Sequence, residues 1–372
     1  MILAAAAFAQ RTTEFEQRPA WLFENDRIAL TVLQTGGSFA EFVLKDDPER
    51  LNPMWNPLRV TRESGQKQGS GTSTGHFVCV DGFGPTYNEE RDAGLSGHGE
   101  ACRQPWLIKS ITSEKGLTVV AFQTNLPLVQ ENFRRTVSIN PGEQVVKVSS
   151  ELESLVAFDR PVCWAEHATI GWPFLEPGVT AVDLSAGPSK TRPHRAGSAS
   201  GHRLKSGEDF TWPMAPTLSG TLIDLRVSPT TSGTVDHTTT LMDPSRKLVF
   251  VTAFHPGKRL LLGYLFRREE YPWLQTWENY TPSMRWARGI EFSSQPFDVP
   301  RREVIQTNTM FGAPVYRWLP AKSKIGSEFL MFLTRTPEGF TRTDDVRLES
   351  GMLIIEDRRG GKRIELKASL GI

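Results

Sequence analysis

A carboxylate stands in the middle of a short apolar run, in the segment RGIEFSSQPFDVP that spans residues 288–300. This carboxylate is Glu291; Ile290 and Phe292 flank it, and Gln295 follows at the start of a turn-like stretch. A glutamate in such a run is either a strand residue that pairs with an arginine on a neighbouring strand, or an acid–base group held on a rigid strand. Taken alone, the segment fits both interpretations.

Two histidines have the chemistry to work with such a carboxylate. His98 lies in the Gly-rich segment SGHGEACRQPW, and His167 lies in PVCWAEHATIGWPFL. An imidazole has an ordinary pKa of about 6.5, and a nearby carboxylate favours its charged, proton-donating form. Two simpler interpretations remain open: His167 as a neutral core residue among apolar neighbours, and His98 as an exposed turn residue.

Tryptophans cluster near these polar residues. The chain has ten tryptophans, among them Trp106 shortly after His98 and Trp277 beside Glu278 in YPWLQTWENY. Flat apolar faces next to hydrogen-bonding groups suit the CH faces and hydroxyls of a sugar, and an indole NH can donate a hydrogen bond. Core filling is the alternative use of a tryptophan, and we expect it to explain at least half of the ten.

The charges and cysteines exclude several classes of partner. There are 43 Lys and Arg against 42 Asp and Glu, so no global field recruits nucleic acid or a membrane surface. The three cysteines have no CxxC spacing, so neither a zinc site nor a disulfide framework is predicted. We therefore expect a small-molecule partner and no metal or cofactor, while the composition does not indicate an oligomeric state.

Five other histidines receive no catalytic role. His76, His237 and His255 show no metal-ligand spacing with one another. His194 and His202 lie in an Arg-rich segment, and we expect both to be solvated.

The first ten residues, MILAAAAFAQ, resemble the end of a secretory signal. Ala7-Phe8-Ala9 matches the small-x-small cleavage pattern, although a basic n-region is missing. We expect a periplasmic or secreted protein cleaved near Ala9, with a cytoplasmic protein that has an apolar tail as the alternative. No later apolar run approaches the roughly 20 residues of a membrane-spanning helix.

Short alternating or β-branched runs recur between turn signals along the chain. In TVSINPGEQVVKV, residues 136–148, Asn-Pro-Gly joins two period-2 runs, which predicts a β-hairpin. No segment of 12 or more residues has a clean helical period, and the nearest candidate is GSEFLMFLTR at residues 326–335. The sequence therefore predicts an all-β, mainly antiparallel fold with little helix.

The pattern also suggests how the chain is divided. We expect residues 1–24 to form a tail, residues 25–340 one large β domain, and residues 341–372 a C-terminal hairpin added to the same domain. Residues 61–75 and 185–220 are rich in Ser and Gly and poor in apolar residues, so both are expected to cross the surface as insertions.

An ordered set of motifs over roughly residues 25–315 resembles the aldose 1-epimerase (galactose mutarotase-like) family. Each motif alone is common, but their order and spacing together are moderately specific. The resemblance implies a large antiparallel β-supersandwich with a sugar cleft on one curved sheet. The motifs are LQTGGSFAEFVL, NPMWNP, GHGEACRQPW, FRRTVSINPGEQVVKVSSELES, AEHATIGWPFLEPG and GIEFSSQPFD.

Carried over by position, the family's base falls on Glu291 and a family histidine that serves as acid falls on His167. His98 matches the other family histidine, in a His-Gly-Glu segment. The resemblance thus implies catalysis by Glu291 and His167 and sugar binding by His98, Gln295, Trp106, Trp277 and Glu278. We find no counterpart of the aspartate that contacts substrate hydroxyls in the family, and TWENY at residues 276–280 is the candidate for its place.

These residue types also suit the reaction itself. Interconverting α and β anomers needs one base for the C1 hydroxyl and one acid for the ring oxygen, and no cofactor. The main hypothesis is therefore a mutarotase-like isomerase. The rival is a non-catalytic carbohydrate-binding protein that uses the same cleft. A polysaccharide lyase would need a Tyr or Lys near a uronate-binding Arg, and the chain has only five tyrosines.

Overall fold

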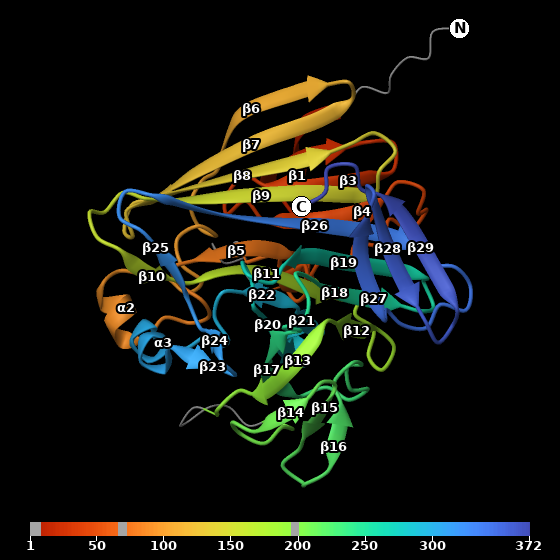
Figure 1. Cartoon of the computed structure of the whole chain (residues 1–372). Helices are drawn as coiled ribbons and strands as arrows, with labels where there is room; N and C mark the ends of the chain where they lie inside the picture. Colours follow the sequence, from red (N-terminus) through yellow and green to blue (C-terminus); the bar gives the residue numbers. More distant parts are fainter. Residues whose placement is uncertain (1–8, 66–72, 195–200) are drawn as a thin grey trace, which may run out of the picture.

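The computed structural model describes residues 9–65, 73–194 and 201–372. Half of the chain is strand and 6% is helix, which confirms the all-β prediction. Figure 1 shows two large antiparallel sheets and a small third sheet near the C-terminus. In the described ranges, no helix is long and apolar enough to cross a membrane.

The larger sheet has 14 strands and carries the candidate site described below. Its spatial order is β1 (Ala9–Phe15), β2 (Arg18–Glu24), β3 (Ile28–Leu33), β4 (Phe39–Leu44), β5 (His76–Val80), β11 (Trp164–Gly171), β21 (Ala287–Gly289), β20 (Trp273–Asn279), β17 (Val235–Met242), β13 (Ala186–Thr191), β14 (Asp209–Thr211), β15 (Met214–Pro216) and β16 (Leu222–Asp224), and β22 (Glu291–Ser293) pairs with both β11 and β20.

The second sheet has eight strands and closes the other side of the core. Its order is β12 (Ala181–Leu184), β18 (Leu248–His255), β19 (Leu260–Arg267), β26 (Lys324–Arg335), β9 (Val145–Ser154), β8 (Glu131–Ile139), β7 (Leu117–Leu126) and β6 (Leu107–Glu114). The hairpin predicted from Asn-Pro-Gly is the β8–β9 connection.

The remaining elements are short. They are α1 (Pro57–Glu63), α2 (Asn88–Asp92), η1 (Pro282–Met284), α3 (Arg301–Thr307), the pair β10 (Arg160–Val162) and β25 (Arg317–Leu319), the pair β23 (Thr309–Met310) and β24 (Ala313–Pro314), and the C-terminal strands β27 (Asp345–Glu349), β28 (Met352–Asp357) and β29 (Lys362–Lys367).

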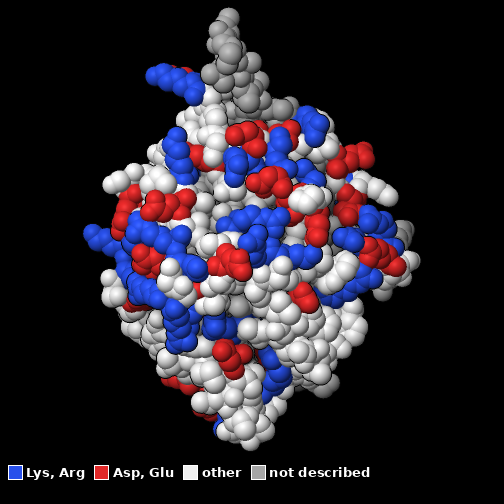
Figure 2. Space-filling view, turned by 90° about the vertical axis from the view of Figure 1, so that its right-hand side faces the viewer, with Lys and Arg blue, Asp and Glu red and all other residues white. Residues whose placement is uncertain are grey.

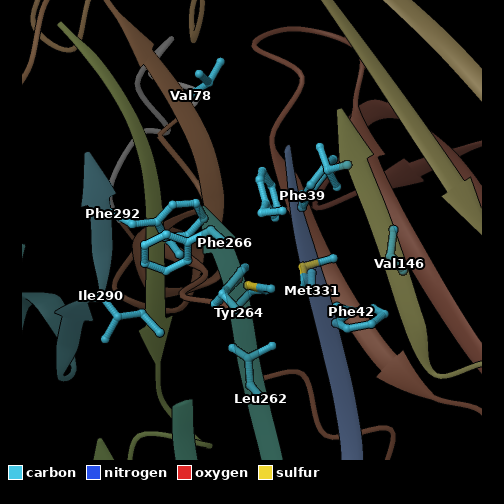
Figure 3. Packing of buried hydrophobic residues seen from close by; sticks show 14 of the residues in the cluster. Phe39, Phe42, Val78, Val146, Leu262, Tyr264, Phe266, Ile290, Phe292 and Met331 are labelled. Carbon is cyan, nitrogen blue, oxygen red and sulfur yellow. The ribbon is translucent and has the colours of Figure 1, made fainter. Parts of the chain in front are cut away.

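The hydrophobic core lies between the two large sheets. Tyr264 and Phe266 of β19 meet Phe292 of β22 there, and the rings of Phe266 and Phe292 stack with centroids 4.4 Å apart. Figure 3 shows this aromatic cluster, with Met331 of β26 next to Phe39 and Phe42 of β4. Burial of such large side chains is the main stabilising contribution to a sandwich of this kind.

A charged cluster is buried inside this apolar layer. Glu166 of β11 accepts hydrogen bonds from Arg135 and Tyr271 and contacts Nε2 of His76 at 2.9 Å, and all four side chains are buried. Burial alone would raise the pKa of the Glu166 carboxyl, but the Arg135 guanidinium and the His76 bond outweigh it, and the pKa falls below its ordinary value. The carboxylate is therefore charged and satisfied within the core.

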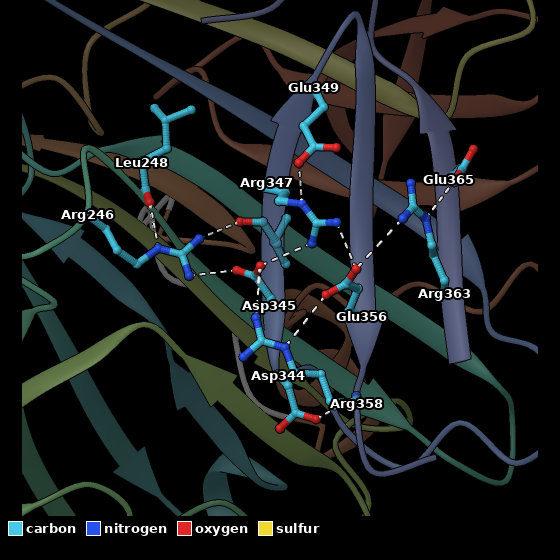
Figure 4. A network of polar contacts seen from close by, with 11 residues as sticks. Arg246, Leu248, Asp344, Asp345, Arg347, Glu349, Glu356, Arg358, Arg363 and Glu365 are labelled. Atoms are coloured by element: carbon cyan, nitrogen blue, oxygen red, sulfur yellow. Dashed lines mark hydrogen bonds and ion pairs between the residues drawn. The ribbon is translucent and has the colours of Figure 1, made fainter. Parts of the chain in front are cut away.

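The C-terminal strands form a third layer and do not extend either large sheet. Leu353 and Ile355 of β28 pack on the outer face of the eight-stranded sheet, against residues such as Leu330 and Phe332. Arg347 lies within hydrogen-bonding distance of both Glu349 and Glu356 on the exposed side of this layer (Figure 4). Acidic and basic side chains are intermingled over this side of the molecule (Figure 2).

Three sequence-based expectations are corrected. The expected tail, residues 1–24, is not a tail from residue 9 onward, because β1 and β2 form the edge of the larger sheet; the expected cleavage site at Ala7 to Ala9 lies largely outside the described residues. The stretch 185–220 contributes β13 to β15 to the same sheet. The helix candidate at residues 326–335 is part of β26, whose two faces are both covered, so its apolar residues run continuously instead of alternating.

Candidate functional site

The candidate site lies on the face of the 14-stranded sheet that points away from the core. Side chains alternate between the faces of a strand, and residues paired across neighbouring strands share a face. Glu166 and Phe292 are paired and point into the core, so their sequence neighbours point the other way. The outward pairs are Phe77 with His167, Gln275 with Glu291, and His237 with Trp277.

All of these side chains except that of Gln275 line a pocket of about 250 Å³. Trp55, which precedes α1, closes one side and meets Trp277 edge to face with ring centroids 6.1 Å apart. Trp55 is fixed in place because its backbone NH donates to the carbonyl of Thr169 on β11. The ionisable groups that line the pocket are His98, His167, His237, Glu291 and Asp298, and Ser73 also lines it.

Glu291 and His167 form the central pair of the pocket. Nε2 of His167 lies 3.2 Å from Oε1 of Glu291, and both side chains are buried. The imidazole is held by a 2.9 Å contact between its Nδ1 and Oγ1 of Thr169, and it stacks on Phe77 with centroids 4.2 Å apart. Gly289 makes room for the carboxyl, since a Cβ there would lie 1.9 Å from Oε1 of Glu291.

Burial shifts the two pKa values of this pair toward each other's ordinary range. Burial, and then the nearby charge of Asp298, raise the pKa of Glu291 well above its ordinary value. Burial, and then the proximity of His98, lower the pKa of His167 well below its ordinary value. Both shifts favour the uncharged pair, in which Glu291 carries a proton and His167 is neutral. Transfer of this proton across the 3.2 Å contact produces a carboxylate and an imidazolium.

His98 is held as a neutral donor. The NH of Gly84 lies 3.4 Å from Nδ1 of His98, and Sγ of Cys79 lies 3.5 Å from the same nitrogen. A backbone NH can only donate, so Nδ1 is the acceptor and Nε2 carries the proton. Burial lowers the pKa of His98 to about 4, which keeps this imidazole neutral at pH 7.

His237 is a third histidine of the pocket. Nε2 of the Gln275 amide donates to the backbone carbonyl of Gln295 at 3.0 Å, so its oxygen faces Nε2 of His237 at 2.8 Å. The other ring nitrogen, Nδ1, lies 3.6 Å from Oδ1 of Asp298. That carboxylate oxygen also accepts a 2.6 Å hydrogen bond from Nε of Arg192. The chain of contacts fixes the orientation of the His237 ring.

Three of the residues expected to bind sugar lie elsewhere. Trp106 is buried in the core, where its indole NH donates to the carbonyl of Ala101 at 2.9 Å. Glu278 follows Trp277 on β20 and therefore points to the opposite face, where it pairs with Arg203 and Arg288.

Gln295 is the third of these residues. Its amide donates to the carbonyl of Phe297 at 2.6 Å and shapes the turn after β22 without lining the pocket. Trp277, in contrast, does line the pocket beside His98, His167 and Glu291.

Several other residues of this region were not predicted from the sequence. Asp298 lies seven residues after Glu291 in the motif GIEFSSQPFD, and this position could have identified it as a site residue. His237 is brought to the pocket only by the pairing of its strand with that of Trp277. His194 and His202, expected to be solvated, stack with centroids 4.1 Å apart and line a neighbouring pocket.

Neither a disulfide nor a metal cluster is present in the described parts of the chain. Cys79, Cys102 and Cys163 are all free. Within residues 9–65, 73–194 and 201–372, no group of three or more His, Cys, Asp or Glu side chains is arranged to hold a metal ion.

Comparison with known proteins identifies the fold of this chain. No protein-family model matches the sequence, and no curated protein matches it. Among solved structures, a galactose mutarotase-like protein from Clostridium acetobutylicum has a TM-score of 0.58 and 11% identity, covering 88% of this chain and 99% of that one. A galactose mutarotase related enzyme from Lactobacillus acidophilus gives 0.54 and 13%, covering 88% and 100%.

A third structure agrees with these two. A galactose mutarotase-like protein from Lactobacillus casei has a TM-score of 0.53 and 12% identity, covering 85% of this chain and 100% of that one. The fold is therefore galactose mutarotase-like, as the motif order predicted.

Proposed function

We propose that this protein is an isomerase that interconverts the α and β anomers of an aldose. The observation that carries the proposal is the buried pair of Glu291 and His167, with 3.2 Å between Oε1 and Nε2, in a pocket walled by Trp55 and Trp277. One base and one acid are the two groups that the reaction requires. The tryptophan faces suit the CH faces of a pyranose ring.

The reaction begins when the pair has moved its proton to His167. The Glu291 carboxylate takes the proton of the C1 hydroxyl while the His167 imidazolium protonates the ring oxygen, and the bond between C1 and the ring oxygen breaks. The open-chain aldehyde rotates about the bond between C1 and C2. Closure on the other face returns one proton from Glu291 to the C1 oxygen and one from the ring hydroxyl to His167. No net proton is taken up or released.

The rest of the pocket supports this sequence of steps. Neutral His98 presents its Nε2 proton to a sugar oxygen and does not compete as an acid, because its pKa of about 4 keeps it uncharged. Exclusion of water by Phe77 and Phe83 strengthens the electrostatic interactions of the pair. Proton transfers by positioned groups typically contribute about 10² to 10⁴ each in rate.

The second candidate is a carbohydrate-binding protein without catalysis. The raised pKa of Glu291 favours it, because a protonated Glu291 can hydrogen-bond a sugar but cannot take a proton. This candidate uses the same pocket and the same aromatic walls.

Anomer exchange separates the two candidates. We expect the protein to accelerate the mutarotation of freshly dissolved α-D-glucose or α-D-galactose, measured by polarimetry and by NMR exchange spectroscopy at equilibrium. Binding of these sugars in calorimetry without any acceleration would support the binding protein. Neither acceleration nor binding across a panel of aldoses would contradict both.

A further inference from the structure

The pocket at Glu291 is one end of a longer cleft. A second cavity of about 140 Å³ shares His237, Trp277 and Asp298 with it. A third cavity of about 310 Å³ shares Arg192 and His194 with the second. The three cavities are therefore adjacent, and the last of them ends at α3.

The far cavity has an apolar floor. Phe297, Val299, Val304 and Val315 line it, and the last three belong to or pack against an apolar cluster behind α3. Tyr87 adds an aromatic ring whose hydroxyl donates to the carbonyl of Asp298 at 2.9 Å. Aromatic and aliphatic surface of this kind suits the CH face of a sugar ring.

Hydrogen-bonding groups lie along the same walls. Nε of Arg192 donates a hydrogen bond to Oδ1 of Asp298, and Nη2 donates to the Asp298 carbonyl at 3.4 Å. The remaining nitrogen, Nη1, makes no hydrogen bond within the described chain. Thr307, the last residue of α3, and Glu303 supply a hydroxyl and a carboxylate. These groups match the hydroxyls of a sugar.

The cations that line the far cavity in the described part of the chain are paired with carboxylates. Lys190 contacts Asp209, and Arg192 is paired with Asp298, so these two cations of the described lining are neutralised. Glu303 adds a negative charge to the lining. A phosphate or a carboxylate would meet no uncompensated cation among the lining residues that the structure describes, and a neutral polyol fits better.

We infer that the cleft binds a neutral reducing oligosaccharide of at least two rings. Its reducing ring lies against Glu291 and His167, and the next ring lies between Arg192 and α3. This inference rests on the proposed anomer exchange, because only a ring with a free C1 hydroxyl can react in the first pocket. The pocket at Glu291 is about 250 Å³, smaller than the roughly 300 to 1,000 Å³ of typical ligand sites. Together with its two neighbours it falls within that range.

A matched pair of variants on α3 tests the inference. Thr307 is exposed and lines the far cavity, whereas the adjacent Gln306 is exposed and does not. Thr307→Trp places an indole in the far cavity, and Gln306→Trp adds the same side chain outside it. Circular dichroism and melting temperature check that both variants remain folded.

The assay compares mutarotation of D-glucose with that of maltose, cellobiose and lactose. For the unmodified protein we expect kcat/KM at least tenfold higher for one of the disaccharides than for D-glucose. Thr307→Trp should remove that advantage and leave D-glucose within twofold, and Gln306→Trp should change neither. No preference for any disaccharide, or an equal loss on both substrate types in Thr307→Trp, would overturn the inference while leaving the mutarotase proposal standing.

Failure of the proposed function gives a different set of mutarotation and binding results. If no sugar is accelerated, the mutarotase proposal falls and the second subsite is judged by calorimetry with the same proteins. Disaccharide binding that is weakened about tenfold in Thr307→Trp but not in Gln306→Trp would support the subsite. Equal binding in both variants, or no binding of any disaccharide, would overturn it.

Discussion

Replacing Glu291 with glutamine keeps the shape and hydrogen-bonding reach of the side chain but removes the carboxylate that we propose as the base for the C1 proton. We expect kcat/KM for anomer exchange to fall by about two to four orders of magnitude. Each tenfold loss corresponds to about 1.36 kcal/mol, so the barrier rises by about 2.7 to 5.4 kcal/mol. Sugar affinity should change little, because the lost interaction belongs mainly to the transition state.

The same substitution should not destabilise the protein. Burial raises the pKa of Glu291 above its unfolded value, so the folded state holds the proton more tightly between these two pKa values. The free energy of unfolding of the unmodified protein therefore decreases as pH rises through this window. Glutamine cannot ionise, and Glu291→Gln should be equally or more stable at pH 8 while matching the unmodified protein at pH 4.

Glu278→Gln is the matched control, because this buried carboxylate lies on the adjacent strand and on the other face. Its loss leaves Arg288 buried without its ion pair, a change that costs about 3 to 5 kcal/mol. An unfolding entropy of about 2.1 cal/mol/K per residue gives about 0.8 kcal/mol/K for 372 residues. The control should therefore melt about 4 to 6 °C lower and keep its activity per folded molecule.

Calorimetry and NMR exchange spectroscopy on the same samples distinguish a catalytic from a structural role of Glu291. A catalytic Glu291 predicts lost activity with an unchanged or higher melting temperature, the reverse of the control. A folded Glu291→Gln protein that melts several degrees lower and still exchanges anomers at the original rate would refute the assignment, and Glu291 would then be a structural residue.

His167→Asn should lower activity to a similar extent, and its combination with Glu291→Gln should be less than additive, because the two groups act as one unit; strictly additive losses in kcat/KM would contradict this. Asp298→Asn removes a charge that raises the pKa of Glu291, so the acid limb of the profile of kcat/KM against pH should move to lower pH. An unmoved or alkaline-shifted limb would count against that coupling. Arg135→Met leaves Glu166 without its main partner in the core and should lower the melting temperature by about 4 to 6 °C, measured by calorimetry; an unchanged melting temperature would show that the ion pair is not stabilising.

The fold could be predicted from the sequence where the preferences of neighbouring residues determine the structure. Asn140-Pro141-Gly142 sets the β8–β9 hairpin because its turn preference is local. The stretch from Phe329 to Leu333 is a helix candidate in the sequence because its strand structure depends on tertiary packing. Its continuous apolar run reflects burial by two separate layers, a tertiary property that no window of sequence contains.

The candidate site was partly accessible for similar reasons. The order of motifs singled out Glu291, His167 and His98, which the structure brings into one pocket. Adjacent residues of a strand point to opposite faces of the sheet. Trp277 and Glu278 of β20 therefore cannot both line the pocket, and the sequence alone could have excluded Glu278 from the site once Trp277 was placed in it. His237 could not be found, since its place depends on pairing between strands 38 residues apart in sequence, as the contact between His237 and Gln275 illustrates.

The buried cluster around Glu166 has a consequence for which way β11 faces. Glu166 and His167 are neighbours, one directed to the charged cluster of the core and the other to the cleft. A slip of β11 by one residue would exchange the two sides, leaving Arg135 facing an imidazole in the core and a carboxylate stranded among the aromatic walls. We expect Arg135 to favour the correct register of β11, because a chain in which His167 faces inward would leave Arg135 without its ion pair.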